Sequence, residues 1–435
     1  MLSQGFLESL LEKSDIKIVL FVLEHKRSYY EKEFQRERVK IVGIDRKCQP
    51  FGSRFFRELS FLLLRTNTMR ISLKSRAIAE DKYGFFFLWS FLSRLGSLSF
   101  CRFLFRLLVN VSSRPFFDSY FETLRPSLVV SLDVKHSLDA QMIIEASKKN
   151  INTMGMVRSW DNLTAKGILR ALPKIMIVHN EIIKREAVSL SDMPAEDIIV
   201  VGIPHYDIYI NENRSPREVF CASIGADPNK TLVIFGPIGS NYSSADKNIL
   251  ADLEGAVKDG RLPKDLQFIV RFPPGDTADV ADFKGNPLFV FDRPGMRFSS
   301  NDLKDTEMTH KDSRHLADSL YHAAAIVAGP STLLIDALAF DKPTIALGYD
   351  GSSKKLPFYK SSRRYFDYDH MSTLIKTKAV SLAESSESLI EALSRALIFK
   401  DEKKQERLKA VYEQCGPLDG KASRRLALSI LRQLR

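Results

Sequence analysis

The chain has 435 residues, of which 44% are hydrophobic and 27% are charged, so it is long enough for two folded domains and is not typical of a disordered protein. Its net charge of +11 favours anionic or phosphorylated partners without choosing among them. The four cysteines are far apart and form no Cys-x-x-Cys pair, which argues against a zinc site and a disulfide framework and fits a reducing cytoplasm.

The first 15 residues, MLSQGFLESLLEKSD, carry two glutamates and no basic region, so no signal peptide is expected. The chain also has no stretch of about 18 uncharged apolar residues, so a spanning helix is not expected.

The N-terminal half alternates short apolar runs with segments of helical periodicity. One helical segment is Ser137–Lys149, whose apolar residues recur at helical spacing. The predicted strands are Ile16–Leu23, Val39–Ile44, Ser127–Leu132, Thr153–Val157, Ile175–Val178 and Ile198–Val201. This alternation predicts an α/β domain with a parallel sheet.

Residues 51–121 have a different composition. Phe and Leu dominate, and Arg94, Arg102 and Arg106 interrupt them. On one helix these arginines would fall within about a third of the circumference, at roughly 100° per residue. Such a helix suits an anionic membrane surface, whereas packing into the domain core is the alternative interpretation.

The polar stretch Asn211–Pro216 breaks the periodicity, and we expect it to link two domains. In the second half the predicted strands are Leu232–Phe235, Phe268–Val270, Leu288–Phe291, Ala325–Ala328 and Thr344–Leu347. Asp276–Pro294 and Arg297–Ser313 are expected to be mostly loop outside the short strand, and Ser386–Lys409 and Lys421–Arg435 to be helices. The predicted division is a first domain over residues 1–210, a second over 211–417 and a basic helix over 418–435.

The most informative segment is Val327–Asp350, which predicts a strand, a turn, a helix and a second strand. The turn follows Gly329-Pro330, and we expect Ser331 to cap the helix. A helix start at the carboxyl edge of a sheet offers free N–H groups and the positive end of the helix dipole. The segment therefore predicts a phosphate site at Ser331 and Thr332.

Two further loops of the second half fit the same site. Gly236, Pro237 and Gly239 follow a predicted strand, and their glycines let backbone N–H groups approach a ligand. Arg271 ends the next strand, where its planar fork could bind phosphate or form a surface ion pair. His310, Arg314 and His315 precede a later strand and could reach the same place.

In the first half, candidate residues follow the predicted strands, where parallel sheets bind ligands. Asp133 and His136 are candidate general bases, with capping of the next helix as the alternative. In the next loop, Trp160 could stack on a sugar or base. The other candidate ligand contacts of this half are Asp161, Asn162, Lys166 and His205. An Asx-turn explains Asp161 and Asn162 equally well, and a structural hinge explains His205.

Other chemistries lack their sequence patterns. The eight histidines show no His-Glu-x-x-His or His-x-His spacing, so no metal site is expected. No Gly-x-Ser-x-Gly elbow occurs. The basic residues are scattered, so a nucleic-acid partner is not expected.

Two α/β halves with a phosphate-binding second half resemble the GT-B architecture of nucleotide-sugar glycosyltransferases, which implies two Rossmann-like domains with parallel sheets facing a cleft. The segment GPSTLLIDALAFDKPTIALGYDG is similar to the C-terminal motif of the CDP-glycerol glycerophosphotransferase family. By that resemblance Ser331, Thr332, Asp336, Lys342-Pro343 and Asp350 surround the donor phosphates.

The sequence departs from the motifs of the families that it resembles at two places. Arg271-Phe272-Pro273 resembles that family's Arg-x-His-Pro but lacks the histidine. The first half, with Asp133 after a strand, also resembles UDP-N-acetylglucosamine 2-epimerases. Their Gly-Gly-x-Gln-Glu-Glu motif is missing, because Gly329–Asp336 reads GPSTLLID. The loop SWDNLTAKG looks like one in bacterial surface-polysaccharide biosynthesis proteins.

The resemblance implies a metal-independent glycosyltransferase of bacterial cell-envelope polysaccharide biosynthesis. It would use a nucleotide-sugar donor as co-substrate, no bound cofactor, and a glycan or lipid-linked acceptor whose hydroxyl Asp133 or His136 deprotonates. The expected location is the cytoplasm or the inner face of an anionic membrane. Alternatives are a CDP-glycerol-type transferase, an enzyme like the 2-epimerases, and a non-catalytic assembly scaffold.

Overall fold

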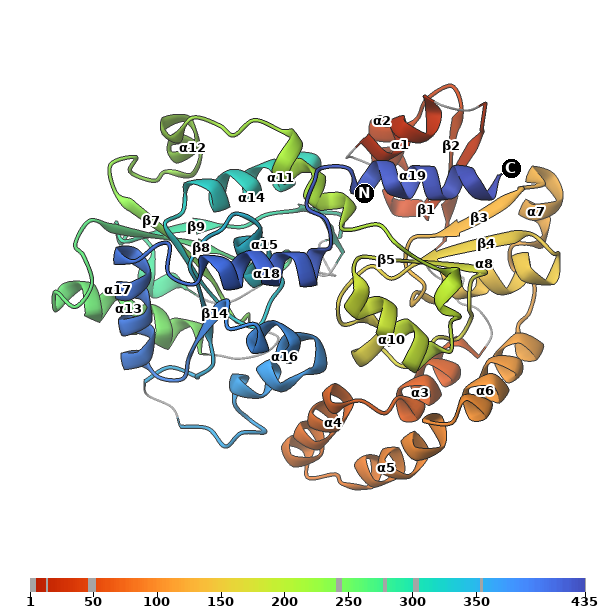
Figure 1. Cartoon of the computed structure of the whole chain (residues 1–435), viewed down its shortest axis with the longest axis horizontal. Helices are drawn as coiled ribbons and strands as arrows, with labels where there is room; N and C mark the ends of the chain where they lie inside the picture. The colour runs from red at the N-terminus through yellow and green to blue at the C-terminus, as the bar shows by residue number, and fades with distance from the viewer. Residues whose placement is uncertain are drawn as a thin grey trace. The chain divides into compact units, whose positions relative to one another are not determined.

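The structure is a computed structural model that describes residues 5–12, 15–45, 52–239, 245–276, 280–299, 305–352 and 355–434. The chain divides into two compact units (Figure 1). The first unit comprises residues 1–207 and 415–435, and the second comprises residues 208–414. Each is an α/β unit built on parallel strands, so the predicted fold class is confirmed.

The first unit contains a two-stranded and a four-stranded parallel sheet. β1 (Ile18–Leu23) pairs with β2 (Val39–Ile44). The larger sheet has the order β3 (Leu128–Ser131), β4 (Asn152–Met156), β5 (Ile175–Val178) and β6 (Ile198–Val200). Around them lie α1 (Leu7–Leu11), α2 (Arg27–Phe34), α8 (Ser137–Lys148), α9 (Asn162–Ala165), α10 (Glu181–Ser191) and α19 (Ala422–Gln433). Leu426 and Ile430 of α19 pack against Met154 and Ile177, so the C-terminal helix completes the core of the first unit.

The Phe- and Leu-rich segment forms several helices rather than one. They are α3 (Ser53–Leu63), α4 (Asn67–Glu80), α5 (Gly84–Gly96), α6 (Ser99–Ser112) and α7 (Asp118–Leu124). The expectation that Arg94, Arg102 and Arg106 share one helix is wrong, because Arg94 belongs to α5 and the other two belong to α6. Among the described residues no single helix is long and apolar enough to cross a bilayer; α5 and α6 meet that test only as a pair, bent by 102°.

The second unit holds a six-stranded parallel sheet in the order β14-β13-β12-β7-β8-β9. Its strands are β7 (Thr231–Gly236), β8 (Leu266–Arg271), β9 (Phe289–Asp292), β12 (Ala325–Ala328), β13 (Thr344–Leu347) and β14 (Val380–Ala383). Counted in chain order from the β9 edge, this is the 3-2-1-4-5-6 arrangement of dinucleotide-binding folds. The order reverses between β7 and β12, where such sheets bind ligands.

The helices of the second unit cover this sheet, whose buried core includes Phe235, Phe268 and Val327. They are α11 (Asp207–Asn211), α12 (Arg217–Ile224), α13 (Asp246–Lys258), α14 (His310–His322), α15 (Leu333–Ala339), α16 (Asp369–Lys376), α17 (Ser386–Ile398) and α18 (Lys404–Cys415). β10 (Met296–Arg297) and β11 (Thr306–Glu307) form a short antiparallel pair.

Two predictions about this unit were wrong, and one strand was missed. The helix expected over Ser386–Lys409 is interrupted between α17 and α18, where Lys403 has a positive φ of 61° that a continuous helix does not allow. Helix α14 begins inside the stretch expected to be loop. Strand β14 was not predicted.

Candidate functional site

The two loops predicted to bind phosphate come from the two strands at the reversal point of the second sheet. Ala328 pairs with Gly236 at the carboxyl ends of β12 and β7, and the N–H of Gly329 donates to the carbonyl of Gly236 over 2.9 Å. A Cβ atom added at Gly329 would lie 2.6 Å from the Cα of Ile238. The loops are therefore in direct contact, and only glycine allows that approach.

Ser331 and Thr332 lie at the start of α15 but do not cap it as expected. Thr332 occupies the N-cap position without a side-chain capping bond, and Leu334 N–H donates to the carbonyl of Ser331 over 3.3 Å. Thr332 is exposed and Ser331 is half-buried. Within the described part of the chain neither hydroxyl has a hydrogen-bond partner, so both can bind a ligand without breaking an existing bond.

The glycine loop after β7 is held by a carboxylate. Asp246, the first residue of α13, accepts hydrogen bonds from the backbone N–H groups of Ile238 (2.7 Å) and Gly239 (3.0 Å). Burial raises the pKa of Asp246 to about 6, and the nearby charge of Asp276 adds to the rise. Pro237 has no N–H to offer, so the amides expected to meet a ligand are engaged within the loop. The two residues that follow Gly239 in the sequence, Ser240 and Asn241, lie outside the described residues.

Arg271, at the end of β8, forms a buried ion pair with Asp292 at the end of β9. It is 5% exposed, so the pair does not lie on the surface. The Nε2 of His315 lies 3.1 Å from the Oδ2 of Asp292. Burial alone would raise the pKa of Asp292, but the hydrogen bond from His315 and the charge of Arg271 hold it below its ordinary value. The Nη2 of Arg271 is buried and has no partner among the described residues, which leaves one donor for an anion.

The other residues named by the resemblance have partners within the fold. Asp336 accepts a hydrogen bond from the hydroxyl of Tyr209 over 2.9 Å. The Nζ of Lys342 donates to a backbone carbonyl over 2.8 Å, and Asp350 accepts from the N–H of Ser362 over 2.9 Å. These three side chains therefore hold loops and helices of the second unit together.

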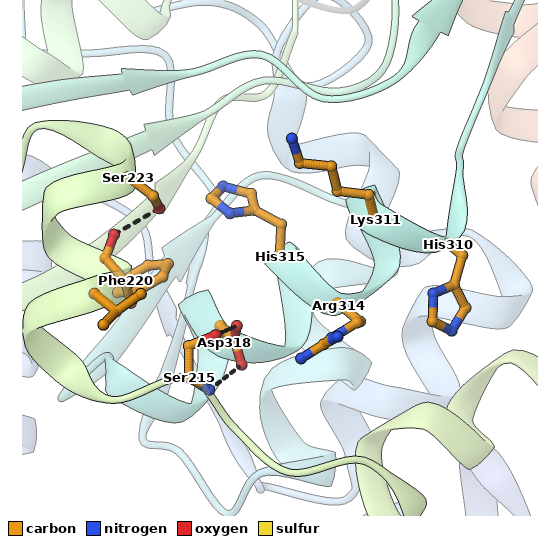
Figure 2. Close-up of a pocket in the computed structure, with 9 residues that line it drawn as sticks. Ser215, Phe220, Ser223, His310, Lys311, Arg314, His315 and Asp318 are labelled. Atoms are coloured by element: carbon orange, nitrogen blue, oxygen red, sulfur yellow. Dashed lines mark hydrogen bonds between the residues drawn. The ribbon is translucent and has the colours of Figure 1, made fainter.

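A cavity of about 310 Å³ lies between α12 and the first turns of α14 (Figure 2). His310 and Arg314 both bind the carboxylate of Glu212, at 2.7 Å and 3.1 Å. Figure 2 shows the ring of His315 on the side of the cavity that Phe220 lines, and the two ring centroids are 5.8 Å apart. Since His315 also binds Asp292, this cavity adjoins the Arg271 ion pair.

In the first unit, Asp133 forms a turn after β3. Its Oδ1 accepts from the N–H of Lys135 over 3.1 Å, and its Oδ2 lies 3.7 Å from the Nε of Arg158. His136 is the N-cap residue of α8 but makes no side-chain capping bond; its Nδ1 lies 3.3 Å from Asp139. Asp133 thus combines an Asx-turn with a second oxygen that faces a cation.

The loop after β4 buries its tryptophan. The Trp160 ring meets the ring of His179 edge-on, with centroids 5.7 Å apart. The Nζ of Lys166 binds Oδ1 of Asn162 (3.0 Å) and Oδ1 of Asp161 (3.1 Å). The Nδ2 of Asn162 is buried and has no partner among the described residues, so this loop presents an amide donor rather than an open aromatic face.

Two polar groups of this region, His179 and Lys135, were not predicted as site residues from the sequence. His179 follows β5 directly, is fully buried and has a pKa lowered to about 4 by that burial; its Nδ1 has no partner in the described part of the chain. Lys135 donates to the carbonyl of Gly167, and burial, with the charge of Arg170, lowers its pKa to about 7. Inspection of the residue after each strand would have found His179, because the strand itself was predicted.

The remaining candidate of the first unit, His205, lies on its own element, near enough to His179 for their charges to interact. It belongs to the short 3-10 helix Pro204–Tyr206, has an exposed side chain and packs edge-on against Tyr206, with ring centroids 4.8 Å apart. Gly202 before it has a positive φ of 83°. Across the described residues, no group of three or more His, Cys, Asp and Glu side chains could hold a metal ion.

No protein-family model and no curated protein matches the chain. Solved structures do. The UDP-N-acetylglucosamine 2-epimerase of Neisseria meningitidis, bound to UDP-N-acetylglucosamine, is 11% identical over 99% of this chain and 96% of its own, with a TM-score of 0.53. MnaA of S. aureus with UDP is 11% identical over 97% of both chains, with a TM-score of 0.49.

The wall teichoic acid polymerase TagF is 14% identical over 71% of this chain and 73% of its own, with a TM-score of 0.46. At these identities the likeness to the Neisseria epimerase concerns the fold alone. The chain has the GT-B-like fold of that epimerase, an α/β architecture that includes parallel sheets of four and six strands.

Proposed function

We propose that this chain is an enzyme that acts on a nucleotide-activated sugar and holds the nucleotide diphosphate in its second unit. One observation carries the proposal: both predicted phosphate loops lie at the reversal point of a 3-2-1-4-5-6 sheet, in contact through Gly329 and Ile238. The hydroxyls of Ser331 and Thr332 supply unengaged donors there.

Arg271 supplies the matching charge at the same edge of the sheet. Asp292 binds one of its amino groups, and Nη2 is left for a phosphate oxygen. Fixed donors of this kind stabilise the charge that develops on a diphosphate as it leaves the sugar. The likeness to an epimerase whose structure contains UDP-N-acetylglucosamine supports a UDP-linked sugar as the substrate.

Glycosyl transfer is the reaction that the first unit's residues support. Asp133 would take the proton from an acceptor hydroxyl as the oxygen attacks the sugar carbon, and the nucleoside diphosphate would leave with the bonding electron pair. The Nε of Arg158 lies 3.7 Å from the Oδ2 of Asp133, so a cation stands beside the proposed base.

Epimerisation is the second candidate, and the comparison supports it more directly than transfer, because the epimerase likeness extends over 99% of this chain. The sequence of Gly329–Asp336 argues against epimerisation. This segment lacks the paired glutamates of the Gly-Gly-x-Gln-Glu-Glu motif of the 2-epimerases. Only Asp336 carries a carboxylate there, and it is bonded to Tyr209.

A donor screen with product analysis tests the proposal. Thermal unfolding is measured with UDP-, GDP-, CDP- and CMP-linked donors, including CDP-glycerol, and a stabilising donor is then incubated with and without acceptors. An epimerase converts the sugar nucleotide without an acceptor and incorporates solvent deuterium at the inverted carbon. A transferase releases nucleotide only with an acceptor. If no donor stabilises the chain, the proposal fails and a non-catalytic role is favoured.

A further inference from the structure

Helix α6 has its apolar side chains on the outside. Arg102, Phe105 and Val109 are buried and face the protein. The exposed large apolar side chains are Phe100, Phe103, Leu104, Leu107, Leu108 and Val111. Their spacing places them on one stripe that covers roughly 140° of the helix. A helix of a water-soluble surface normally has the opposite arrangement.

Helix α5, which precedes α6 in the chain, also exposes apolar residues. Its inner stripe is packed: Trp89 donates to the carbonyl of Leu64 over 3.0 Å, and a Cβ added at Gly96 would lie 1.9 Å from the carbonyl oxygen of Leu63. The exposed large apolar residues of α5 and of the turn that follows it are Phe85, Phe87, Leu88, Phe91, Leu95 and Leu98. Together with the α6 stripe they form what we call the apolar face.

A buried ion cluster fixes this orientation. Arg102 is 6% exposed and binds the carboxylate of Asp192, at the end of α10, with its Nη2 at 2.5 Å; Arg106 binds the other oxygen over 2.6 Å. Arg102 also donates to the carbonyl of Gly96 over 2.9 Å. Turning α6 to bury its apolar stripe would break this cluster and leave buried charges unpaired, which is costly. The outward stripe is therefore specified by the fold.

The segment that carries the apolar face contains charges of one sign. Between residues 82 and 117 the chain has five basic residues and no acidic residue. Arg102 and Arg106 serve the internal cluster, whereas Lys82 and Arg94 are exposed beside the face. The α6 stripe itself presents no hydrogen-bonding side chain, although protein interfaces carry about one hydrogen bond per 100–200 Å². Apolar side chains bordered by cations match lipid tails beneath anionic headgroups.

We propose that the apolar face docks onto the surface of a lipid bilayer that carries anionic headgroups, with α5 and α6 lying in the interface between headgroups and tails. Figure 1 shows both helices at the rim of the first unit, beyond α3 as seen from its sheet. The 102° bend between them suits helices that lie along the bilayer rather than cross it. The inference does not depend on the nucleotide-sugar proposal.

Vesicle co-sedimentation of the full chain tests the docking. The vesicles are phosphatidylcholine alone or an equimolar mixture with phosphatidylglycerol. The double variant Phe103→Gln/Leu108→Gln removes two side chains that are 56% and 57% exposed. Its matched control is Phe399→Gln/Leu408→Gln in the second unit, where the exposures are 57% and 51%. The first variant should lower partitioning onto the mixed vesicles at least tenfold, whereas the control should leave it unchanged.

A second variant tests the charge. Lys82→Gln/Arg94→Gln should weaken binding to the mixed vesicles at low salt and remove most of its salt dependence. Absence of binding to the mixed vesicles would overturn the proposal, as would equal losses in the Phe103/Leu108 variant and its control. It would also be overturned if sedimentation equilibrium showed a dimer that only the Phe103/Leu108 variant dissociates, because a second copy would then cover the face.

Discussion

The buried carboxylate of Asp246 accepts a hydrogen bond from the backbone N–H of Gly239 over 3.0 Å, at the carboxyl edge of the second sheet. It also accepts from Ile238, so the two described amides after β7 are already paired. Two anions cannot share the same amides. A phosphate at this edge must therefore bind mainly through the β12 side, where the hydroxyls of Ser331 and Thr332 are unengaged.

Asp246 also makes stability depend on pH. Because its folded-state pKa is raised from 3.8 to about 6, its contribution favours the folded state most below the unfolded-state pKa and is lost as pH rises through 6. Asp246→Asn removes this dependence. Between about pH 4 and about pH 7, wild type should lose roughly 2 kcal/mol of unfolding free energy relative to the variant. Urea unfolding at several pH values measures this, and parallel profiles would contradict it.

Gly329→Ala should disrupt the contact between the two loops, because the added Cβ would lie 2.6 Å from a backbone atom of Ile238. We expect a loss of about 1–3 kcal/mol in unfolding free energy and weaker nucleotide binding. Gly255→Ala is the matched control: it lies within α13 and its Cβ would meet nothing within 4 Å. That change should stabilise the chain by up to about 1 kcal/mol. Similar unfolding temperatures for the two variants would refute the close approach.

Apart from β14, the described parallel strands could be predicted because each is a short apolar run with polar or charged neighbours; Thr344–Leu347 was predicted to the residue. Strand β14 was not predicted because only its first and last residues are buried, which leaves no apolar run. The role of Asp246 at the glycine loop was not predicted for another reason. Asp246 and Gly239 lie seven positions apart in the chain, and no periodicity marks such a contact.

The orientation of the apolar face also depends on a contact between residues far apart in the chain, which local sequence patterns do not predict. Composition marked the segment as unusual, but the direction of α6 depends on Asp192, which lies 90 residues from Arg102 in the chain. The arginines were expected to form a basic edge, yet two of them point inward to that carboxylate. The spacing of residues on a helix gives the angle between their side chains, but it does not show which side of the helix packs against the protein.

Asp192→Asn tests this cluster. Asparagine tolerates the positive φ of 59° at this position, so the change removes charge without straining the backbone. It leaves Arg102 and Arg106 without their counter-ion, and we expect a loss of about 3 kcal/mol. The control, Asp259→Asn, breaks an exposed pair with Arg261 and should cost under about 1 kcal/mol. Denaturant midpoints compare them, and equal losses would contradict a buried cluster.

The same aspartate predicts an acid effect. Burial alone would raise its pKa, but hydrogen bonds from Arg102 and Arg106 hold the pKa of Asp192 well below its usual range. Its contribution is therefore present above its unfolded-state pKa and is lost as pH falls below that value. In Asp192→Asn this part of the acid destabilisation should be absent.

Asp133→Asn tests the proposed base. The new side chain can still accept the hydrogen bond from the N–H of Lys135, so the turn should persist. If the chain is a transferase, turnover should fall at least about a hundredfold while donor affinity stays unchanged. Asp118→Asn, at a surface pair with Lys149, serves as the control. Full turnover in the Asp133 variant would remove this residue from the mechanism.

Calorimetric titration of UDP into the wild type and into Ser331→Ala/Thr332→Val measures most directly whether the second unit holds a nucleoside diphosphate at the ends of β7 and β12. Neither hydroxyl has a partner among the described residues, so the unfolding temperature should not change. UDP should bind the wild type, and the double variant should bind it at least about tenfold more weakly. Equal affinities, or no binding of UDP by the wild type, would contradict the proposed site.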